Sequence, residues 1–186
     1  SVAELTLGLA LALSRNIASQ DQITKSGSWT RTPGTEISGK TWGLMGCGAT
    51  GRATANLLKG FNCRVLGYDP FFSGNQEIQM VSWNELVSQS DLISVHMPAT
   101  AETIGSLNKD FFAQMKSSAL LVNVGRGELI IEQDLITALK AKTIAGAALD
   151  VRATEPPTVG ELETLPNLIL TPHIAGITKE SQSAIN

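Results

Sequence analysis

The sequence predicts an α/β fold in which a doubly wound parallel sheet of about six strands is covered by helices on both faces. Two observations support this prediction. Short apolar segments alternate with helical segments from residue 41 onward, which is typical of a parallel sheet buried on both sides. A glycine-rich loop also stands between the first apolar segment and the first helical one, as in doubly wound folds that bind ligands beyond the carboxyl ends of the strands.

The composition limits the possible classes of protein. The chain has 186 residues, 42% hydrophobic and 17% charged, which is enough apolar material for one globular core. Its formal net charge of −3 offers no basic face, so we expect no nucleic-acid partner. No apolar run reaches the roughly 18 residues of a membrane span, so we expect no membrane association.

The two cysteines, Cys47 and Cys63, lack the spacing of a metal site. We therefore predict no metal and two reduced thiols in a cytoplasmic protein, because disulfides are rare in that compartment. The apolar segment Ser1–Ile17 carries Glu4 and Arg15 and has neither a basic start nor a small-residue cleavage site, unlike a signal peptide.

Residues 1–40 are predicted to form a helix followed by an arm. The apolar positions of Ser1–Ile17 follow helical spacing, and the apolar face is wide enough to need a partner surface. From Gln20 to Lys40 the chain is polar and is predicted to be irregular, with turn signals at 26–28 and 32–34.

The alternating elements follow from residue 41. A capping box, Ser82-Trp83-Asn84-Glu85, begins one of the helices. Strands are predicted over 41–45, 64–68, 92–96, 120–124, 144–150 and 168–170, and helices from the glycine loop to 59, from 82, over 111–115 and 132–140, and from 179 onward.

The glycine loop, Gly46-Cys47-Gly48-Ala49-Thr50-Gly51, has the spacing of a Rossmann dinucleotide-binding fingerprint. The three glycines would permit a tight turn, close approach of a pyrophosphate, and close packing of the helix on the sheet. The N-terminus of the following helix offers free N–H groups to the phosphates. These six residues are therefore predicted to bind the cofactor.

Asp69 ends the next predicted strand, 18 residues after Gly51. Its carboxylate would accept hydrogen bonds from the adenosine ribose and would repel a 2′-phosphate, at a cost on the order of a few kcal/mol. Pro70, Phe71 and Phe72 supply no arginine to offset that repulsion, so we predict NAD rather than NADP. The alternative is an ordinary aspartate at a turn before Pro70.

Three ionisable residues follow later strands: Arg126 in 122–127, Glu155 in 150–156 and His173 in 171–176. Each has an ordinary interpretation, as a solvated loop arginine, a surface glutamate before proline, or a polar histidine with satisfied hydrogen bonds. Their placement beyond one edge of the sheet, beside a nicotinamide site, favours a catalytic interpretation.

With these motifs in this order, the sequence resembles the D-isomer-specific 2-hydroxyacid dehydrogenases, a family that includes phosphoglycerate, glycerate, D-lactate and formate dehydrogenases. The resemblance runs from about Ser1 to the end and rests on the glycine loop and the segments 90–98, 111–129, 145–156 and 171–176. It implies that Arg126, Glu155 and His173 are catalytic, and that Asp150 holds the nicotinamide carboxamide. His96, Pro98, Val124 and Gly125 are placed with the cofactor-binding residues; for His96 a structural or backbone-contact role is favoured over chemistry.

The chemistry suits these side chains. Oxidation of a 2-hydroxy acid needs a base for the hydroxyl proton, and imidazole titrates near neutral pH, so His173 is the expected base. Glu155 would bind the other ring nitrogen and fix the tautomer. Arg126 would hold the substrate carboxylate with two hydrogen bonds.

Three residues depart from the family pattern. Cys47 is uncommon between the first two glycines and could make the loop sensitive to thiol reagents. Lys142 stands where a helix-ending glycine is usual, so it must adopt a positive φ or end the helix differently. Arg152 replaces the aromatic residue that is usual after Asp150-Val151, so the packing expected from the family pattern on the nicotinamide side, and the substrate preference, do not carry over.

The resemblance implies three parts: a linker helix and arm (1–40), an NAD-binding Rossmann domain (41–176), and the start of a return helix (177–186) to a substrate domain that is absent here. We therefore expect NAD binding with little or no turnover by this chain alone. Pairing of such domains through the first helix and arm implies a homodimer; alternatively, the helix packs on its own sheet or on the absent domain.

The leading hypothesis is the cofactor-binding domain of an oxidoreductase that transfers hydride between NAD and a small 2-hydroxy or 2-keto acid. One alternative is a non-catalytic NAD(H) sensor or corepressor-like module of the same fold. Another is an unrelated Rossmann enzyme such as an amino-acid dehydrogenase, against which the order of the later motifs argues.

Overall fold

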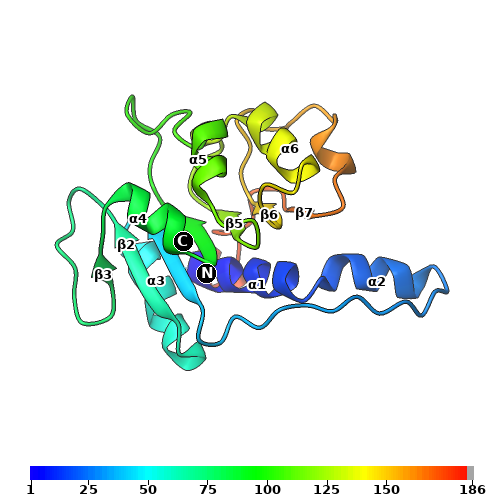
Figure 1. The fold of residues 1–186 in the computed structure, drawn as a ribbon, viewed down its shortest axis with the longest axis horizontal. Helices are drawn as coiled ribbons and strands as arrows, with labels where there is room; N and C mark the ends of the chain where they lie inside the picture. The colour runs from blue at the N-terminus through cyan, green and yellow to red at the C-terminus, as the bar shows by residue number, and fades with distance from the viewer. Residues whose placement is uncertain (184–186) are drawn as a thin grey trace.

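A parallel sheet forms the centre of the fold (Figure 1). The computed structural model describes residues 1–183, and within that range the sheet has seven strands in the order β3-β2-β1-β4-β5-β6-β7. The doubly wound prediction is therefore confirmed. The strands are β1 (Thr41–Met45), β2 (Arg64–Tyr68), β3 (Gln79–Met80), β4 (Leu92–Val95), β5 (Leu120–Asn123), β6 (Gly146–Leu149) and β7 (Leu168–Leu170).

Helices cover both faces of the sheet. One core cluster joins α1 and α3 to side chains such as Trp42 and Leu44, and the other joins α4, α5 and α6 to side chains such as Met45. Leu44 and Met45 lie on opposite faces because successive strand residues alternate. The helices are α1 (Val2–Ser14), α2 (Ile17–Lys25), α3 (Ala49–Leu58), α4 (Trp83–Gln89), α5 (Lys109–Gln114), α6 (Glu132–Lys140) and α7 (Lys179–Ser183), with 3-10 turns at η1 (Lys59–Phe61), η2 (Gly127–Leu129) and η3 (Leu162–Thr164).

The register of the strands aligns their carboxyl ends. Met45 pairs with Tyr68 on one side and Val95 on the other. Val95 in turn pairs with Asn123, and Asn123 pairs with Leu149. The residues that follow these strands therefore form a row along one edge of the sheet. That row contains Gly46, Asp69, His96, Val124 and Asp150.

Two elements differ from the prediction. The short strand β3 adds a seventh strand to the expected six or so; two residues are too few to produce a periodicity. Helix α2 occupies residues that were expected to be irregular from Gln20 onward, so only 26–40 lack a helix or strand. It has no buried residues, and its Lys25–Asp21 ion pair of 2.8 Å joins successive turns, so apolar spacing could not reveal it.

The first helix packs on the sheet of its own chain. Leu9 and Ala10 of α1 are buried in the same cluster as Trp42, and α1 contacts α3, β5, β6 and β7. The alternative expectation, that this helix packs on its own sheet, is therefore the arrangement observed, and pairing into a dimer stays a prediction. Beyond Asn16, which takes a positive φ of 55°, α2 and the segment after it extend away from the sheet as an arm (Figure 1).

Lys142 ends α6 with a φ of 55°, so the lysine accepts the left-handed conformation that glycine usually provides. At the other end of the chain, α7 lies where a helix was expected from residue 179 onward. The remainder of the segment 177–186 that was expected to begin a return helix, residues 184–186, lies outside the described part, and the return to a substrate domain stays a prediction. Over residues 1–183, no helix combines the length and apolar character that crossing a bilayer requires.

Candidate active site

The glycine loop joins β1 to α3 in a conformation that needs glycine. Gly46 has a φ of +95°, and a Cβ there would lie 3.0 Å from the backbone of His96 and Met97. At Gly51 a Cβ would lie 2.2 Å from the Gly46 carbonyl oxygen, so this glycine lets α3 start close to the sheet. Gly48 is the N-cap of α3 and faces open space, where a ligand can approach the backbone.

The N-terminus of α3 is suited to a pyrophosphate. The first backbone bond of the helix runs from the Arg52 amide to the Gly48 carbonyl, so the amides of Ala49, Thr50 and Gly51 precede it. Such amides have no partner within the helix and attract anions.

Asp69 follows β2 and is held beside the loop. Its Oδ2 accepts a 2.7 Å hydrogen bond from the Cys47 amide, and its Oδ1 accepts a 2.8 Å bond from the Phe71 amide. Each carboxylate oxygen keeps a second lone pair that could accept a ribose hydroxyl. The residues present therefore fit a dinucleotide cofactor.

Arg52 is a neighbour of this site that the sequence reasoning missed. Its Nη1 donates to the Cys47 carbonyl at 3.0 Å, and its guanidinium lies 5.6 Å from the centre of the Phe72 ring. Arg52 lies in the first turn of α3 and not among the residues that follow Asp69, where a cation for a 2′-phosphate was expected to stand. The arginine directly after Gly51 was the available signal.

Cys47 is shielded rather than reactive. Its side chain is fully buried, and its sulfur lies where a Cβ at Gly67 would approach to 2.8 Å. Burial, together with the negative charge of Asp69, raises the pKa of the thiol to about 12. This environment argues against the expected sensitivity of the loop to thiol reagents, because a protonated thiol is a poor nucleophile.

A cleft of about 640 Å³ opens between the glycine loop and α5. Its walls include Gly46, Asp69 and Pro98, with the aromatic rings of Trp83 and Phe111. This volume lies in the range of ligand sites. Thr100 and Thr103 shape the rim: the Thr103 hydroxyl donates to the Pro98 carbonyl and accepts from the Thr100 amide, both at 2.7 Å.

His96 has a structural environment. The Trp42 indole donates to the Ser94 hydroxyl at 2.8 Å, and that hydroxyl lies 2.9 Å from His96 Nε2. The other ring nitrogen of His96, Nδ1, is buried and has no hydrogen-bond partner among residues 1–183. Burial lowers the pKa of His96 to about 4, so the ring is neutral at physiological pH. Its backbone packs against Gly46, which is consistent with a backbone-contact role.

The loop after β5 carries Arg126 and is shaped by Asn123. The Asn123 amide nitrogen donates to the Arg126 carbonyl at 2.9 Å, and its oxygen accepts from the Gly125 amide at 3.0 Å. Gly125, next to Val124, lies against the backbone after β4, where a Cβ would approach the Met97 carbonyl to 2.9 Å. Asn123 was not assigned a role from sequence, although a polar residue in an apolar strand was a signal.

Glu155 and His173 form a hydrogen-bonded pair across the loops after β6 and β7. His173 Nδ1 lies 2.7 Å from Glu155 Oε2, and the other Glu155 oxygen accepts from the Arg152 amide at 2.9 Å. These two hydrogen bonds lower the pKa of Glu155, and the charge of Arg126 contributes. Arg126 is exposed, and its guanidinium donates to the Gly125 carbonyl at 2.8 Å.

Asp150 holds the loop that carries His173. The side chain is buried and accepts hydrogen bonds from the Thr171 hydroxyl at 2.6 Å and from the amides of Ile174 and Ala175 at 2.9 Å each. His173 itself has a φ of 54°, a strained conformation for a non-glycine residue. The expected contact of Asp150 with a nicotinamide carboxamide stays a prediction.

The chain also matches the model of a known protein family. Residues 7–175 match the NAD binding domain of the D-isomer specific 2-hydroxyacid dehydrogenases. D-3-phosphoglycerate dehydrogenase of Archaeoglobus fulgidus is 41% identical over 98% of this chain and 36% of the relative. Glyoxylate reductase of Thermofilum pendens is 38% identical over 98% of this chain and 57% of that protein.

Solved structures show the same fold. D-lactate dehydrogenase with NAD⁺ from Lactobacillus jensenii superimposes with a TM-score of 0.88 at 32% identity, covering 97% of this chain and 60% of that one. An acyclic imino acid reductase in complex with NADPH and D-Arg gives a TM-score of 0.91 at 34% identity, with coverages of 98% and 60%. The chain therefore spans between about a third and three fifths of the length of these relatives.

Proposed function

Because the chain belongs to the D-isomer-specific 2-hydroxyacid dehydrogenase family and contains its NAD-binding domain, we propose that the protein oxidises a small D-2-hydroxy acid, or reduces the corresponding 2-keto acid. The Glu155–His173 pair supports this proposal most directly. Its 2.7 Å hydrogen bond occupies His173 Nδ1, which leaves Nε2 on the opposite side of the ring for a substrate hydroxyl.

Bound NAD would supply the hydride acceptor. In the oxidation direction, His173 Nε2 accepts the hydroxyl proton of the substrate, and the imidazolium that forms is stabilised by the Glu155 carboxylate. In the reduction direction, the same nitrogen returns the proton. Glu155 also holds the imidazole in the tautomer whose Nε2 carries a lone pair.

Arg126 would bind the substrate carboxylate. Its side chain is exposed and has one hydrogen bond to a backbone carbonyl, so most of its N–H donors remain available. A guanidinium can hold a carboxylate with two parallel hydrogen bonds, which fixes the orientation of the reacting carbon.

The test is a panel of D- and L-2-hydroxy acids and 2-keto acids offered to the full-length protein, with NADH followed by its absorbance. We expect turnover of at least one D-isomer and of the corresponding keto acid, and little with the L-isomer. Binding of NADH without turnover of any panel member would contradict the proposal and would favour an NAD-sensing or corepressor-like module.

We also infer a homodimer formed through the arm. Helix α2 has no buried residues, and Trp29 after it is 81% exposed, so the arm offers apolar surface to a partner. Size-exclusion chromatography with light scattering should show a dimer, which replacement of Trp29 by serine should weaken. A monomer at all concentrations would contradict this inference.

We also propose a cytoplasmic location, because neither cysteine forms a disulfide. Cys47 and Cys63 are both free thiols in the structure, as is usual in a reducing compartment. Fractionation of cells that express the full-length protein would test this location.

A further inference from the structure

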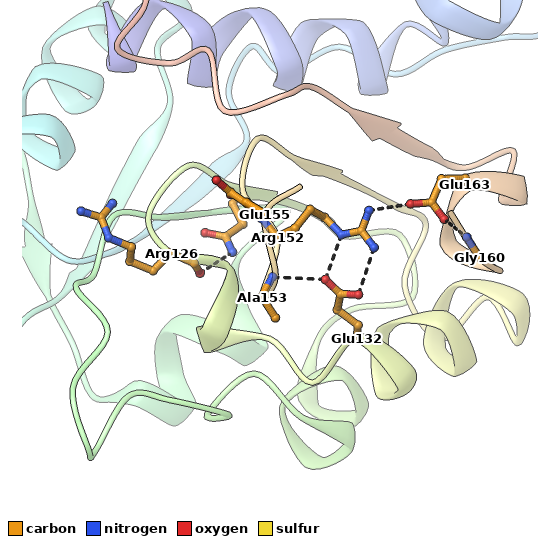
Figure 2. A network of polar contacts seen from close by, with 8 residues as sticks. Arg126, Glu132, Arg152, Ala153, Glu155, Gly160 and Glu163 are labelled. Carbon is orange, nitrogen blue, oxygen red and sulfur yellow. Dashed lines mark hydrogen bonds and ion pairs between the residues drawn. The ribbon is translucent and has the colours of Figure 1, made fainter. Parts of the chain in front are cut away.

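Arg152 follows β6 and lies between two carboxylates from different elements (Figure 2). Its Nε and Nη2 donate to the two oxygens of Glu132, at the start of α6, at 2.8 and 3.0 Å. Its Nη1 donates to Glu163 of η3 at 2.6 Å. The Arg152 side chain is only 11% exposed, so it is largely removed from water.

The same residues also hold the backbone at this point. The Ala153 amide donates to a Glu132 oxygen at 3.4 Å, and the second Glu163 oxygen accepts from the Gly160 amide at 2.7 Å. The ion pairs are therefore joined to the loop that runs from β6 to η3, and both carboxylates are tied to its backbone.

The loop after β6 contacts both the Glu155–His173 pair and the segment that carries Arg126. The Arg152 amide donates to Glu155 Oε1 at 2.9 Å, and the other Glu155 oxygen holds His173. On the opposite side, Gly127 packs so closely that a Cβ there would lie 1.9 Å from the Arg152 carbonyl carbon. The residue after Arg126 thus rests on the Arg152 peptide.

The electrostatics make Arg152 difficult to replace. The pKa of Glu132 is lowered mainly by its hydrogen bonds from Arg152, and a separate hydrogen bond, from Arg152 Nη1, is the main cause that lowers the pKa of Glu163. A neutral residue at 152 would leave two carboxylates close together without a cation, and their repulsion would push η3 and the start of α6 apart.

We propose that Arg152 is a positioning residue: by joining Glu132 and Glu163, it holds the loop whose 152 amide orients Glu155 toward His173. The proposal rests on the function proposed above for Glu155 and His173. It assigns a role to a position where this chain departs from the aromatic residue that its family resemblance leads one to expect.

The tautomer of the neutral His173 ring provides a readout that needs no turnover. Because Glu155 accepts a hydrogen bond from His173 Nδ1, we expect the Nδ1–H tautomer to dominate when the ring is neutral. The ¹⁵N chemical shifts of the imidazole ring in the 186-residue chain would measure the tautomer ratio. The chain has only two histidines, so a His96→Gln variant assigns the signals. Glu155→Ala defines the tautomer ratio without the hydrogen bond.

We expect Arg152→Gln to lower the ratio of Nδ1–H to Nε2–H tautomer by about three- to tenfold, the range for loss of one hydrogen bond. Arg152→Lys should have an intermediate effect, since it keeps the charge but cannot bind both oxygens of Glu132. The matched control is Lys140→Gln. Lys140 also joins α6 to the segment at η3, through an ion pair with Glu161, which lies outside the 151–155 loop.

A folded Arg152→Gln variant with the unchanged His173 tautomer ratio would overturn the proposal, and so would an equal effect of Lys140→Gln. If Arg152→Gln does not fold, Glu163→Gln removes one arm of the same network and should shift the ratio in the same direction; an unchanged ratio in that variant would overturn the proposal. In the full-length protein, Arg152→Lys should lower kcat and leave the Kd for NADH unchanged. Failure of the proposed dehydrogenase activity would leave the tautomer result intact, so the two outcomes are distinguishable.

Discussion

The backbone of Asp150 accepts a hydrogen bond from the backbone amide of His173 at 2.8 Å, and the Asp150 carboxylate binds both sides of the same turn. The residue that directly follows β6 therefore sets the position of the candidate base after β7. This arrangement explains how His173 keeps a φ of 54°, because the three carboxylate hydrogen bonds offset the strain of a left-handed conformation.

Replacement of Asp150 by alanine should lower the free energy of unfolding by about 3 kcal/mol, because it removes charge-assisted hydrogen bonds and leaves buried donors without an acceptor. Urea unfolding followed by circular dichroism would measure the change. Asp21→Ala, on the exposed arm, is the control and should change stability by less than about 0.5 kcal/mol. Equal stability of the two variants would contradict a holding role for Asp150.

Replacement of His173 by glutamine in the full-length protein should reduce kcat by about 10² to 10⁴, because the base that accepts the hydroxyl proton is lost. The Kd for NADH, measured by fluorescence, should change less than twofold, since the glycine loop and Asp69 are untouched. Undiminished turnover would show that the proton has another acceptor.

Asp69 should make the protein prefer NADH to NADPH. A 2′-phosphate beside the carboxylate costs a few kcal/mol at an effective dielectric near 20, which corresponds to at least about a tenfold difference in Kd. Asp69→Asn should reduce that difference while an amide oxygen remains to accept the Cys47 amide. Glu77→Gln removes the same charge next to β3 and should leave the preference unchanged. Calorimetry with both cofactors would measure the two Kd values. An unchanged preference in Asp69→Asn would show that another residue sets the selectivity for NADH, and Arg52 is the nearest candidate.

Cys47 should resist alkylation in the folded chain. A thiol with a pKa of about 12 has a thiolate fraction of roughly 10⁻⁴ at pH 8, and burial further restricts access. Iodoacetamide labelling followed by peptide mass spectrometry should show slow modification of Cys47 in the folded chain and rapid modification in guanidinium chloride. Rapid labelling of the native chain would mean that the loop opens.

Acid should destabilise the fold through His96. The unfolded chain binds a proton at this ring near pH 6.5, whereas the folded chain does so only near pH 4. Between these values the unfolded state holds more protons, so stability falls as the pH falls, by about 2 kcal/mol between pH 7 and pH 5. His96→Gln should flatten this part of the profile.

The control for this experiment is His173→Gln, which leaves the buried ring in place and should retain the loss of stability. Urea midpoints at pH 7 and pH 5 would provide the comparison. Equal pH dependence in the wild type and in His96→Gln would show that the ring is not the group responsible.

Local patterns were enough to predict much of this protein. The alternation of apolar strands and helices follows from burial on both sheet faces, and the glycine spacing follows from steric limits that act within six residues. The motif order around Arg126, Glu155 and His173 identified the family. Each of these signals lies in a short stretch of chain, so it can be read without knowing what packs against it.

The order of strands and loops along the chain was enough to place these residues at the carboxyl edge of the sheet, because residues that follow parallel strands share one edge. Which of them touch became visible only in the folded chain. The pKa of the Cys47 thiol is raised by burial and by the charge of Asp69, 22 positions away. Arg152 is held by carboxylates 20 positions before it and 11 after it. Burial and charge depend on neighbours distant in the chain, and no local pattern records them.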